Sequence, residues 1–188
     1  MQVIRTKGYE ATTIDDVCAS ARLTKGSFFH HFKSKEELAV ATARHFADMA
    51  DSVFSAAPYT ALPDPLARLL GYVDFRRAIL QRKLPEFTCL LGTMVQETYE
   101  THPAIRKACD RHIGEHAATL TADIAEAKRL YAPRAKWSAE SLGLFTQAAI
   151  QGAFILAKAK HGSDVADECL AHLRRYLELL FNQPKPKE

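Results

Sequence analysis

Three hydroxyl residues stand where short helices should begin. Thr13, Thr24 and Ser34 each precede a run with the apolar spacing of a helix. Asp16 and Glu37 follow the first and the last of them by three residues, which is the spacing of a capping box. The first backbone N–H groups of a helix are unpaired, and with the helix dipole they favour anions such as phosphate oxygens. The segment therefore predicts three closely spaced helix N-termini that could contact phosphate.

The first two of these helices are joined by a very short connection. Only Arg22 and Leu23 are available for the turn, and two short helices joined so tightly must cross steeply. This is the geometry of a helix-turn-helix, whose second helix places its N-terminal residues at base edges in the major groove of DNA. We predict Lys25 to His31 as that recognition helix. The apolar residues assigned to its core are Ile14, Val17, Cys18, Leu23, Phe28 and Phe32.

The predicted DNA contacts are residues that are short, flexible or outward-facing at these helix starts. Thr24 to Ser27 would allow the recognition helix to lie close to the groove, and Thr13 and Lys35 lie at helix N-termini. The full predicted set is Thr13, Thr24, Lys25, Gly26, Ser27, Phe29, His30, Lys33 and Lys35.

The sequence gives less support to enzyme catalysis and to metal binding. No Ser/His/Asp or Cys/His set and no glycine-rich phosphate loop is recognisable, which disfavours the alternative of an all-helical enzyme. His112 and His116 have the i, i+4 spacing of metal ligands but no evident third ligand, so a solvated helix face is expected and no metal or cofactor is predicted. The four cysteines form no C-x-x-C pair, which favours reduced thiols in a cytoplasmic protein.

Composition is that of an ordinary globular chain. Of 188 residues, 47% are hydrophobic and 25% are charged, so the chain can bury a core. The net charge of +3 permits a nucleic-acid partner without arguing for one. No apolar run approaches the ~18 residues of a membrane span, and the N-terminus does not resemble a signal peptide. No membrane association is expected.

Helical periodicity runs through the chain, with apolar residues recurring at three and four. The expected fold is all-α, with about nine helices and a helix running from Ser34 to about Ala57. Prolines at 58, 63 and 65 break the chain after that helix, and one continuous helical segment is expected from Pro103 to Leu130. We divide the chain into an N-terminal domain at 1–45, a larger helical domain at 46–182 and a frayed tail at 183–188.

The run GYEATTIDDVCASARLTKGSFFHHFKSKEELAVA resembles the DNA-binding domain of the tetracycline-repressor (TetR) family of bacterial transcriptional regulators. The resemblance covers residues 1–45 almost continuously. It implies a three-helix DNA-binding domain followed by a helical domain for ligand binding and dimerisation. Two departures stand out: the family usually has tyrosine where Phe29 stands, so a phosphate-contacting hydroxyl is missing, and the chain begins inside the first helix of the family.

The resemblance implies a homodimeric regulator that is not an enzyme. The expected function is repression, with release of a palindromic double-stranded DNA operator when a small-molecule effector binds. A DNA-binding module that answers to a protein partner remains an alternative. The predicted effector-pocket residues are Met49, Phe87, Cys89, Met94, Gln96, Tyr99, Trp137, Phe145, Gln147 and Phe154.

The last two predicted helices carry small residues and a broad apolar face. Small side chains let helices approach closely, so these two helices and their copies would form a four-helix dimer interface. The alternative is that both helices bury these faces within one chain. The predicted interface residues are Ala149, Gly152, Ala153, Leu156, Leu173, Tyr176, Leu177 and Leu180.

Overall fold

The structure is a computed structural model that describes residues 1–181. These residues form eleven α-helices and two short 3-10 helices with no strand among them, which confirms the all-α prediction. The predicted tail at 183–188 lies outside the described residues. In chain order the elements are α1 (Gln2–Lys7), α2 (Ile14–Ala21), α3 (Lys25–His31), α4 (Lys35–Ser55), η1 (Pro58–Ala61), α5 (Pro65–Ala78), η2 (Ile79–Gln81), α6 (Leu84–Phe87), α7 (Leu90–Thr98), α8 (Pro103–Ala118), α9 (Thr121–Tyr131), α10 (Ala139–Lys160) and α11 (Asp164–Phe181).

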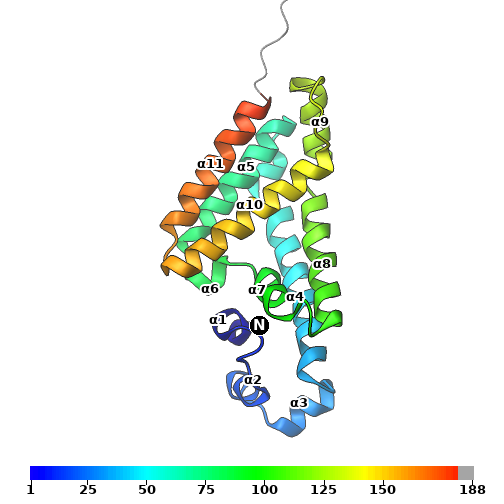
Figure 1. Cartoon of the computed structure of the whole chain (residues 1–188), viewed down its shortest axis with the longest axis vertical. Helices are drawn as coiled ribbons and strands as arrows, with labels where there is room; N and C mark the ends of the chain where they lie inside the picture. Colours follow the sequence, from blue (N-terminus) through cyan, green and yellow to red (C-terminus); the bar gives the residue numbers. More distant parts are fainter. Residues whose placement is uncertain (182–188) are drawn as a thin grey trace, which may run out of the picture. The chain divides into compact units, whose positions relative to one another are not determined.

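The chain forms two compact units, coloured by sequence in Figure 1. The first unit combines residues 1–52 with 88–113, and the second combines 53–87 with the chain from 114 onward. The helices α4 and α8 each contribute residues to both units. The first unit therefore holds more than the predicted 1–45 domain, because α7 and most of α8 fold with it.

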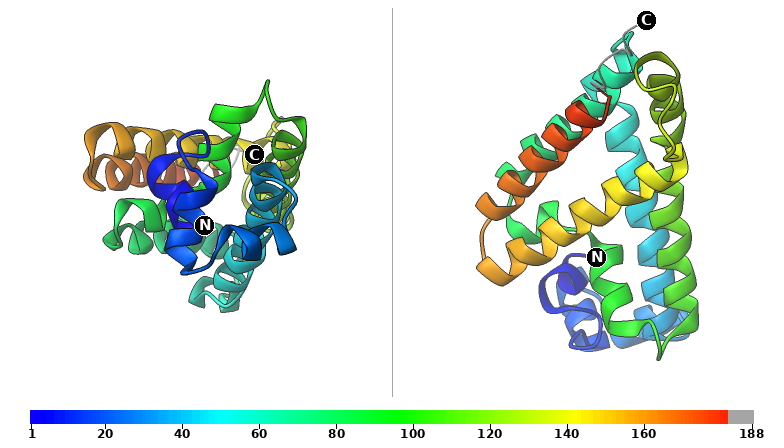
Figure 2. Two further views of the ribbon diagram at one scale, coloured as in Figure 1. Left: turned by 90° about the horizontal axis from the view of Figure 1, so that it is seen from below. Right: turned by 45° about the horizontal axis from the view of Figure 1, so that its top comes forward.

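The first unit has a core built from α1, α4, α7 and α8. Its tightly packed residues are Ile4, Tyr9, Ala39, Ala43, Leu90, Leu91, Met94, Ile105 and Cys109. Figure 2 shows α2 and α3 in blue, following α1 in the chain. Because Ala39 and Ala43 are small and fully buried, α4 can lie close to its neighbours in this core.

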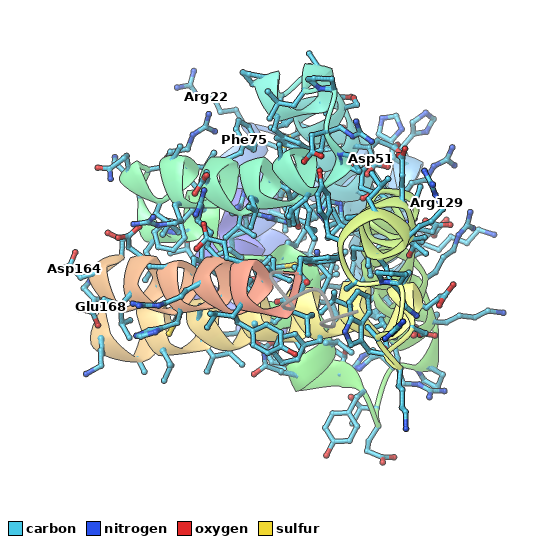
Figure 3. All side chains as sticks on the ribbon, turned by 90° about the horizontal axis from the view of Figure 1, so that it is seen from above. Arg22, Asp51, Phe75, Arg129, Asp164 and Glu168 are labelled. Atoms are coloured by element: carbon cyan, nitrogen blue, oxygen red, sulfur yellow. The ribbon has the colours of Figure 1, made fainter. Side chains whose placement is uncertain are left out.

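The second unit is built around α5, α9, α10 and α11. Seen from above in Figure 3, α11 lies between α5 and α10, in agreement with its contacts to both. Two ion pairs join α5 to α11: Arg77 with Asp167, and Arg174 with Asp74, each at 2.8 Å. The helix α10 ends at His161, whose backbone is left-handed (φ 53°) and turns the chain towards α11.

The predicted continuous helix from Pro103 to Leu130 is wrong, because the chain breaks between α8 and α9 at Thr119 and Leu120. The Thr119 hydroxyl donates to the carbonyl of His116 (2.8 Å), a local bond that competes with helix propagation. Leu120 is buried and makes a tight turn to Ala117. No glycine or proline marks this break, which explains why periodicity alone missed it.

Among the described residues one helix, α10, is long and apolar enough to cross a membrane by length and composition. The core helix of a globular protein passes the same test, and α10 packs against α9 and α11. Its composition is therefore weak evidence for a span.

Candidate functional site: a nucleic-acid interface

The three predicted helix starts are present in the first unit. Thr13 and Asp16 form a reciprocal capping box at the start of α2. The Thr24 hydroxyl accepts the N–H of Ser27 at the start of α3 (3.2 Å). Ser34 accepts the N–H of Glu37 at the start of α4 (3.1 Å).

One cap differs in detail from the expected capping box. The Glu37 carboxylate accepts the N–H of Lys33 (2.7 Å), one residue before Ser34, rather than that of Ser34 itself.

Hydrogen bonds from the Lys7 ammonium and from Thr13 lower the pKa of Asp16 to about 2, so this carboxylate stays ionised at neutral pH.

The recognition helix α3 is anchored by one face and open on the other. Phe28 is buried, whereas the ring of Phe29 is 54% exposed and His30 and Lys33 are also exposed. Thr24, Lys25 and Gly26 are exposed at its N-terminus. Exposed donors at a helix start, followed by an exposed ring and side chains, form a surface that can contact a phosphate backbone and base edges.

Leu23 was assigned to the core of this motif, and that assignment is wrong. Its side chain is 54% exposed. The physical reason is the preceding residue: Arg22 ends α2 in the left-handed conformation (φ 55°), which turns the chain outward before α3 begins.

Two lysines of the predicted set have partners within the chain. Lys25 forms an exposed ion pair with Asp15 (3.0 Å). Lys35 donates to the carbonyl of Tyr9 (3.1 Å), and its ammonium lies 4.3 Å from the centroid of the Tyr9 ring. Lys25 can exchange its partner for a phosphate at little cost, because exposed ion pairs are weak. Lys35 is held more firmly and positions the loop that follows α1.

Two hydrogen bonds that the sequence did not indicate join α7 and the residues just before it to α1 and the turn after α1. The Glu97 carboxylate accepts the backbone N–H of Glu10 (2.9 Å), and Arg5 donates to the carbonyl of Thr88 (2.9 Å). Gly8 lies beside Glu97 with left-handed backbone (φ 87°), and a Cβ there would collide with the Glu97 carboxylate. The glycine thus allows both the turn and the close approach of α7.

The predicted dimer residues divide into two sets in the structure. Ala153, Leu173 and Leu177 are buried inside the subunit and present almost no surface to a second copy. The other five, Ala149, Gly152, Leu156, Tyr176 and Leu180, are exposed or partly exposed. Large exposed apolar side chains that the prediction omitted accompany them on α10 and α11: Leu144, Phe145, Ile155 and Leu179.

The predicted pocket residues divide between the two units. Met49, Cys89, Met94, Gln96 and Tyr99 belong to the first unit, where Met94 is fully buried and the Tyr99 ring is exposed. In the second unit, Phe87 contacts Phe154 (ring centroids 5.9 Å), Phe145 contacts Tyr176 (5.1 Å) and Trp137 contacts Phe181 (5.3 Å).

Gln147 is the one predicted pocket residue that joins a buried polar cluster in the second unit. Its amide donates to the hydroxyl of Tyr72 (2.7 Å), which also contacts Arg76 and His116 (both 3.0 Å). His116 was expected on a solvated face, and that expectation is wrong: burial, with the nearby charge of Arg76, lowers its pKa to about 3. The i, i+4 spacing of Tyr72 and Arg76 on α5 was visible in the sequence, but their partners come from α8 and α10.

The part of the chain that the structure describes holds no group of three or more His, Cys, Asp or Glu side chains placed to hold a metal ion. The four cysteines are free thiols, and burial, with the nearby Cys89, raises the pKa of Cys109 to about 12.

Comparison with known proteins agrees with this geometry in both halves of the chain. Residues 1–42 match the family described as "Bacterial regulatory proteins, tetR family". Residues 65–172 match the family described as "Transcriptional regulator LmrA/YxaF-like, C-terminal domain".

One individual relative matches most of the chain, and another matches about half of it. The HTH-type transcriptional repressor DhaR of Mycobacterium sp. (strain GP1) is 26% identical over 170 residues, which cover 90% of this chain and 83% of the relative. The transcriptional regulator AcuR of Cereibacter sphaeroides is 29% identical over 101 residues, which cover 52% of this chain and 44% of that protein.

Solved structures share the fold. The regulatory protein TetR from Rhodobacter sphaeroides superposes with a TM-score of 0.81 at 21% identity, covering 96% of this chain and 94% of that chain. A TetR-family regulator from Agrobacterium tumefaciens gives a TM-score of 0.79 at 21% identity, covering 96% and 92%. These relatives are transcriptional regulators and not enzymes. The chain belongs to the TetR family of bacterial transcriptional regulators, and it is a DNA-binding regulator with an N-terminal helix-turn-helix.

Proposed function

We propose that this chain is a cytoplasmic repressor that binds a palindromic operator as a homodimer and is released by a small-molecule effector. The observation that carries the proposal is the open N-terminus of α3. Thr24, Lys25 and Gly26 are exposed there, while Phe28 holds the helix in place. Within this surface Thr13, Lys33 and the ring of Phe29 supply further contacts to the sugar-phosphate backbone.

Dimerisation is supported by the exposed apolar surface of α10 and α11. Tyr176 and Leu179 are 44% and 65% exposed, and the Phe145 ring packs on Tyr176 from the neighbouring helix. A Cβ at Gly152 would meet open space, so another helix has room to approach there. A second copy of the same face would remove this apolar surface from water.

Release by an effector requires the effector to bind one conformation of the dimer more tightly than the other. The helix α4 is suited to transmit such a difference, since it begins at the Ser34 cap behind α3 and ends at Ser55 in the second unit. Phe54, near its C-terminal end, contacts Tyr72 and His116 of the buried polar cluster.

Footprinting on the DNA upstream of the protein's own gene tests the proposal. We expect protection of an inverted repeat whose half-sites lie about 10 base pairs apart, one turn of the double helix. One dimer should occupy each repeat. Protection of a single half-site by a monomer, or uniform protection without sequence preference, would contradict the proposal. Release of the footprint by a small molecule from the cell of origin tests the effector step separately.

A further inference from the structure

A cluster of four polar side chains lies inside the second unit. Tyr72 and Arg76 come from α5, His116 from α8 and Gln147 from α10. Tyr72 and Gln147 are buried, whereas Arg76 and His116 keep part of their surface. Three helices that are distant in sequence therefore bring their polar groups to one place.

The hydrogen bonds fix the protonation of this cluster. Arg76 donates from Nε to the Tyr72 hydroxyl (3.0 Å) and from Nη2 to Nε2 of His116 (2.7 Å). A guanidinium can only donate, so Nε2 of His116 carries the lone pair and the imidazole is neutral. The lowered pKa of His116 agrees with this assignment.

The cluster holds more donors than acceptors. The Tyr72 hydroxyl receives N–H groups from both Arg76 and Gln147, and its own proton competes with Arg76 for the single lone pair of His116 Nε2, which lies 3.0 Å away. A guanidinium has five N–H groups. Arg76 uses two of them in these bonds, and the other three donate to no residue in the described range 1–181. These unused N–H donors are complementary to a ligand group that is rich in hydrogen-bond acceptors.

The charge of Arg76 is also uncompensated. Its neighbour on the same helix, Arg77, pairs with Asp167, and Arg68 pairs with Asp123. Arg76 forms no ion pair with a carboxylate of residues 1–181. Partly burying a cation without a counter-charge is unfavourable, so the position is better suited to a state in which an anion is bound.

The rings of Phe54 and Tyr72 lie against this cation, and further rings pack on those two. The Arg76 guanidinium lies 4.1 Å from the centroid of the Phe54 ring. The Phe54 ring contacts Phe75 (5.4 Å), and Tyr59 contacts Tyr72 (5.9 Å). Figure 3 labels Phe75 on the side of α5 that faces away from α11. The ring of an aromatic ligand would pack well against these side chains, because aromatic rings pack edge-to-face or offset against one another.

We propose that the effector is a small aromatic carboxylate whose acid group binds Arg76 and whose ring packs among Phe54, Tyr59 and Phe75. The proposal names the chemical class of the effector and, as regards release of DNA, rests on the proposed function. The carboxylate accepts the N–H groups that Arg76 does not use, in a bidentate geometry that guanidinium groups favour. Phe54 lies on α4, so it would transmit binding of the ligand to that helix.

Calorimetric titration of the full-length protein tests the assignment, with benzoate, 3-phenylpropionate and trans-cinnamate as probes and their primary amides as neutral counterparts. We expect at least one acid to bind with a Kd below about 1 mM, with its amide at least tenfold weaker, because only the acid supplies a charge to Arg76. Failure of all three acids to bind, or equal affinity of acids and amides, would overturn the proposal.

Variants locate the site. Arg76→Gln should weaken acid binding at least tenfold and remove the preference over the amide, whereas Arg77→Gln on the same helix serves as the matched control because Arg77 already has a carboxylate partner. If Arg76→Gln does not fold, Arg76→Lys is the second variant: it keeps the charge, loses the planar fork and should weaken acid binding by a smaller factor. Unchanged acid affinity in the folded variants would overturn the site.

Release of operator DNA is measured separately by fluorescence anisotropy. An acid that binds through Arg76 and leaves DNA affinity unchanged would contradict effector release in the proposed function while upholding the site. Release of DNA by a neutral compound, with no acid bound, would uphold the function and contradict the site.

Discussion

The carboxylate of Glu97 accepts the backbone N–H of Glu10 at 2.9 Å, which fixes the C-terminal part of α7 to the turn after α1. This bond and the Arg5 bond to the Thr88 carbonyl add to the apolar core that α7 shares with α1 and α4, and α7 belongs to the same unit as the DNA-binding helices. A helix from the middle of the chain is thus part of the unit that contains α3.

Glu97→Ala should loosen that connection. We expect the variant to lose about 0.5 kcal/mol of unfolding free energy, the low end of the range for one hydrogen bond, because Glu97 and Glu10 are both exposed, and to bind operator DNA more weakly. Urea unfolding and anisotropy measure the two effects. Glu100→Ala is the control, since the exposed Glu100 side chain makes no hydrogen bond within the described chain. Equal behaviour of the two variants would refute a role for the Glu97 bond.

Asp15→Asn should strengthen DNA binding. Asp15 forms an exposed ion pair with Lys25 at 3.0 Å, and this pair must open before the lysine can contact a phosphate. Removing the carboxylate frees Lys25 and removes a negative charge near the DNA, so we expect about a threefold lower Kd at low salt, and less at high salt. Anisotropy at two salt concentrations checks this. Weaker binding by Asp15→Asn would show that Lys25 is not limited by this pair.

Leu179→Glu should separate the dimer. Leu179 is 65% exposed on α11, and a carboxylate at the centre of an apolar interface would be desolvated without a partner. Light scattering should show a monomer for this variant and a dimer for the wild type. Arg129→Ala changes the net charge equally on the exposed surface of α9, where Figure 3 shows its side chain projecting outward, and should remain dimeric. A dimeric Leu179→Glu protein would place the interface elsewhere.

Stability should depend on pH through His116. Its pKa is lowered to about 3 in the folded protein and is near 6.5 in the unfolded chain, so between these values the unfolded state binds the extra proton. The stability that His116 contributes is complete above pH 6.5 and is lost as the pH falls towards 3. Between these values the free energy of unfolding falls by up to about 1.4 kcal/mol per pH unit.

Chemical unfolding of the wild type and of His116→Gln from pH 4 to pH 7 measures this slope. The variant should show a shallower dependence, whereas replacing the exposed His172 in the same way should leave the slope as it is. A slope that is identical in the wild type and His116→Gln would mean that His116 is protonated in the folded protein as readily as in the unfolded chain.

The DNA-binding half was predictable because its information is local. Thr13, Thr24 and Ser34 indicate helix starts because their hydroxyls can accept the backbone N–H three residues ahead, and the structure contains all three hydrogen bonds. The exposure of Leu23 was not predicted because it follows from the left-handed backbone at Arg22. Arginine is not a residue type that indicates such a turn.

The second half depends on contacts that sequence periodicity does not reveal. Apolar spacing on α11 identified Leu173, Tyr176 and Leu177 together, but only packing against α5 and α10 decides that Leu173 and Leu177 are buried while Tyr176 is exposed. The partners of Arg76 are 4 and 40 residues away. A charged residue on a helix is usually solvated, and nothing local distinguishes one that faces inward.

The most direct test of DNA recognition through α3 is the affinity of Lys25→Ala for the DNA upstream of its own gene, measured by anisotropy across a salt series. We predict that the variant binds at least about fivefold more weakly than the wild type, and that the slope of log K against log salt falls by about one for each lysine removed. Lys136→Ala in the second unit is exposed, changes the charge equally and should bind as the wild type does. Equal affinity and an equal slope for Lys25→Ala and Lys136→Ala would contradict DNA recognition through the N-terminus of α3.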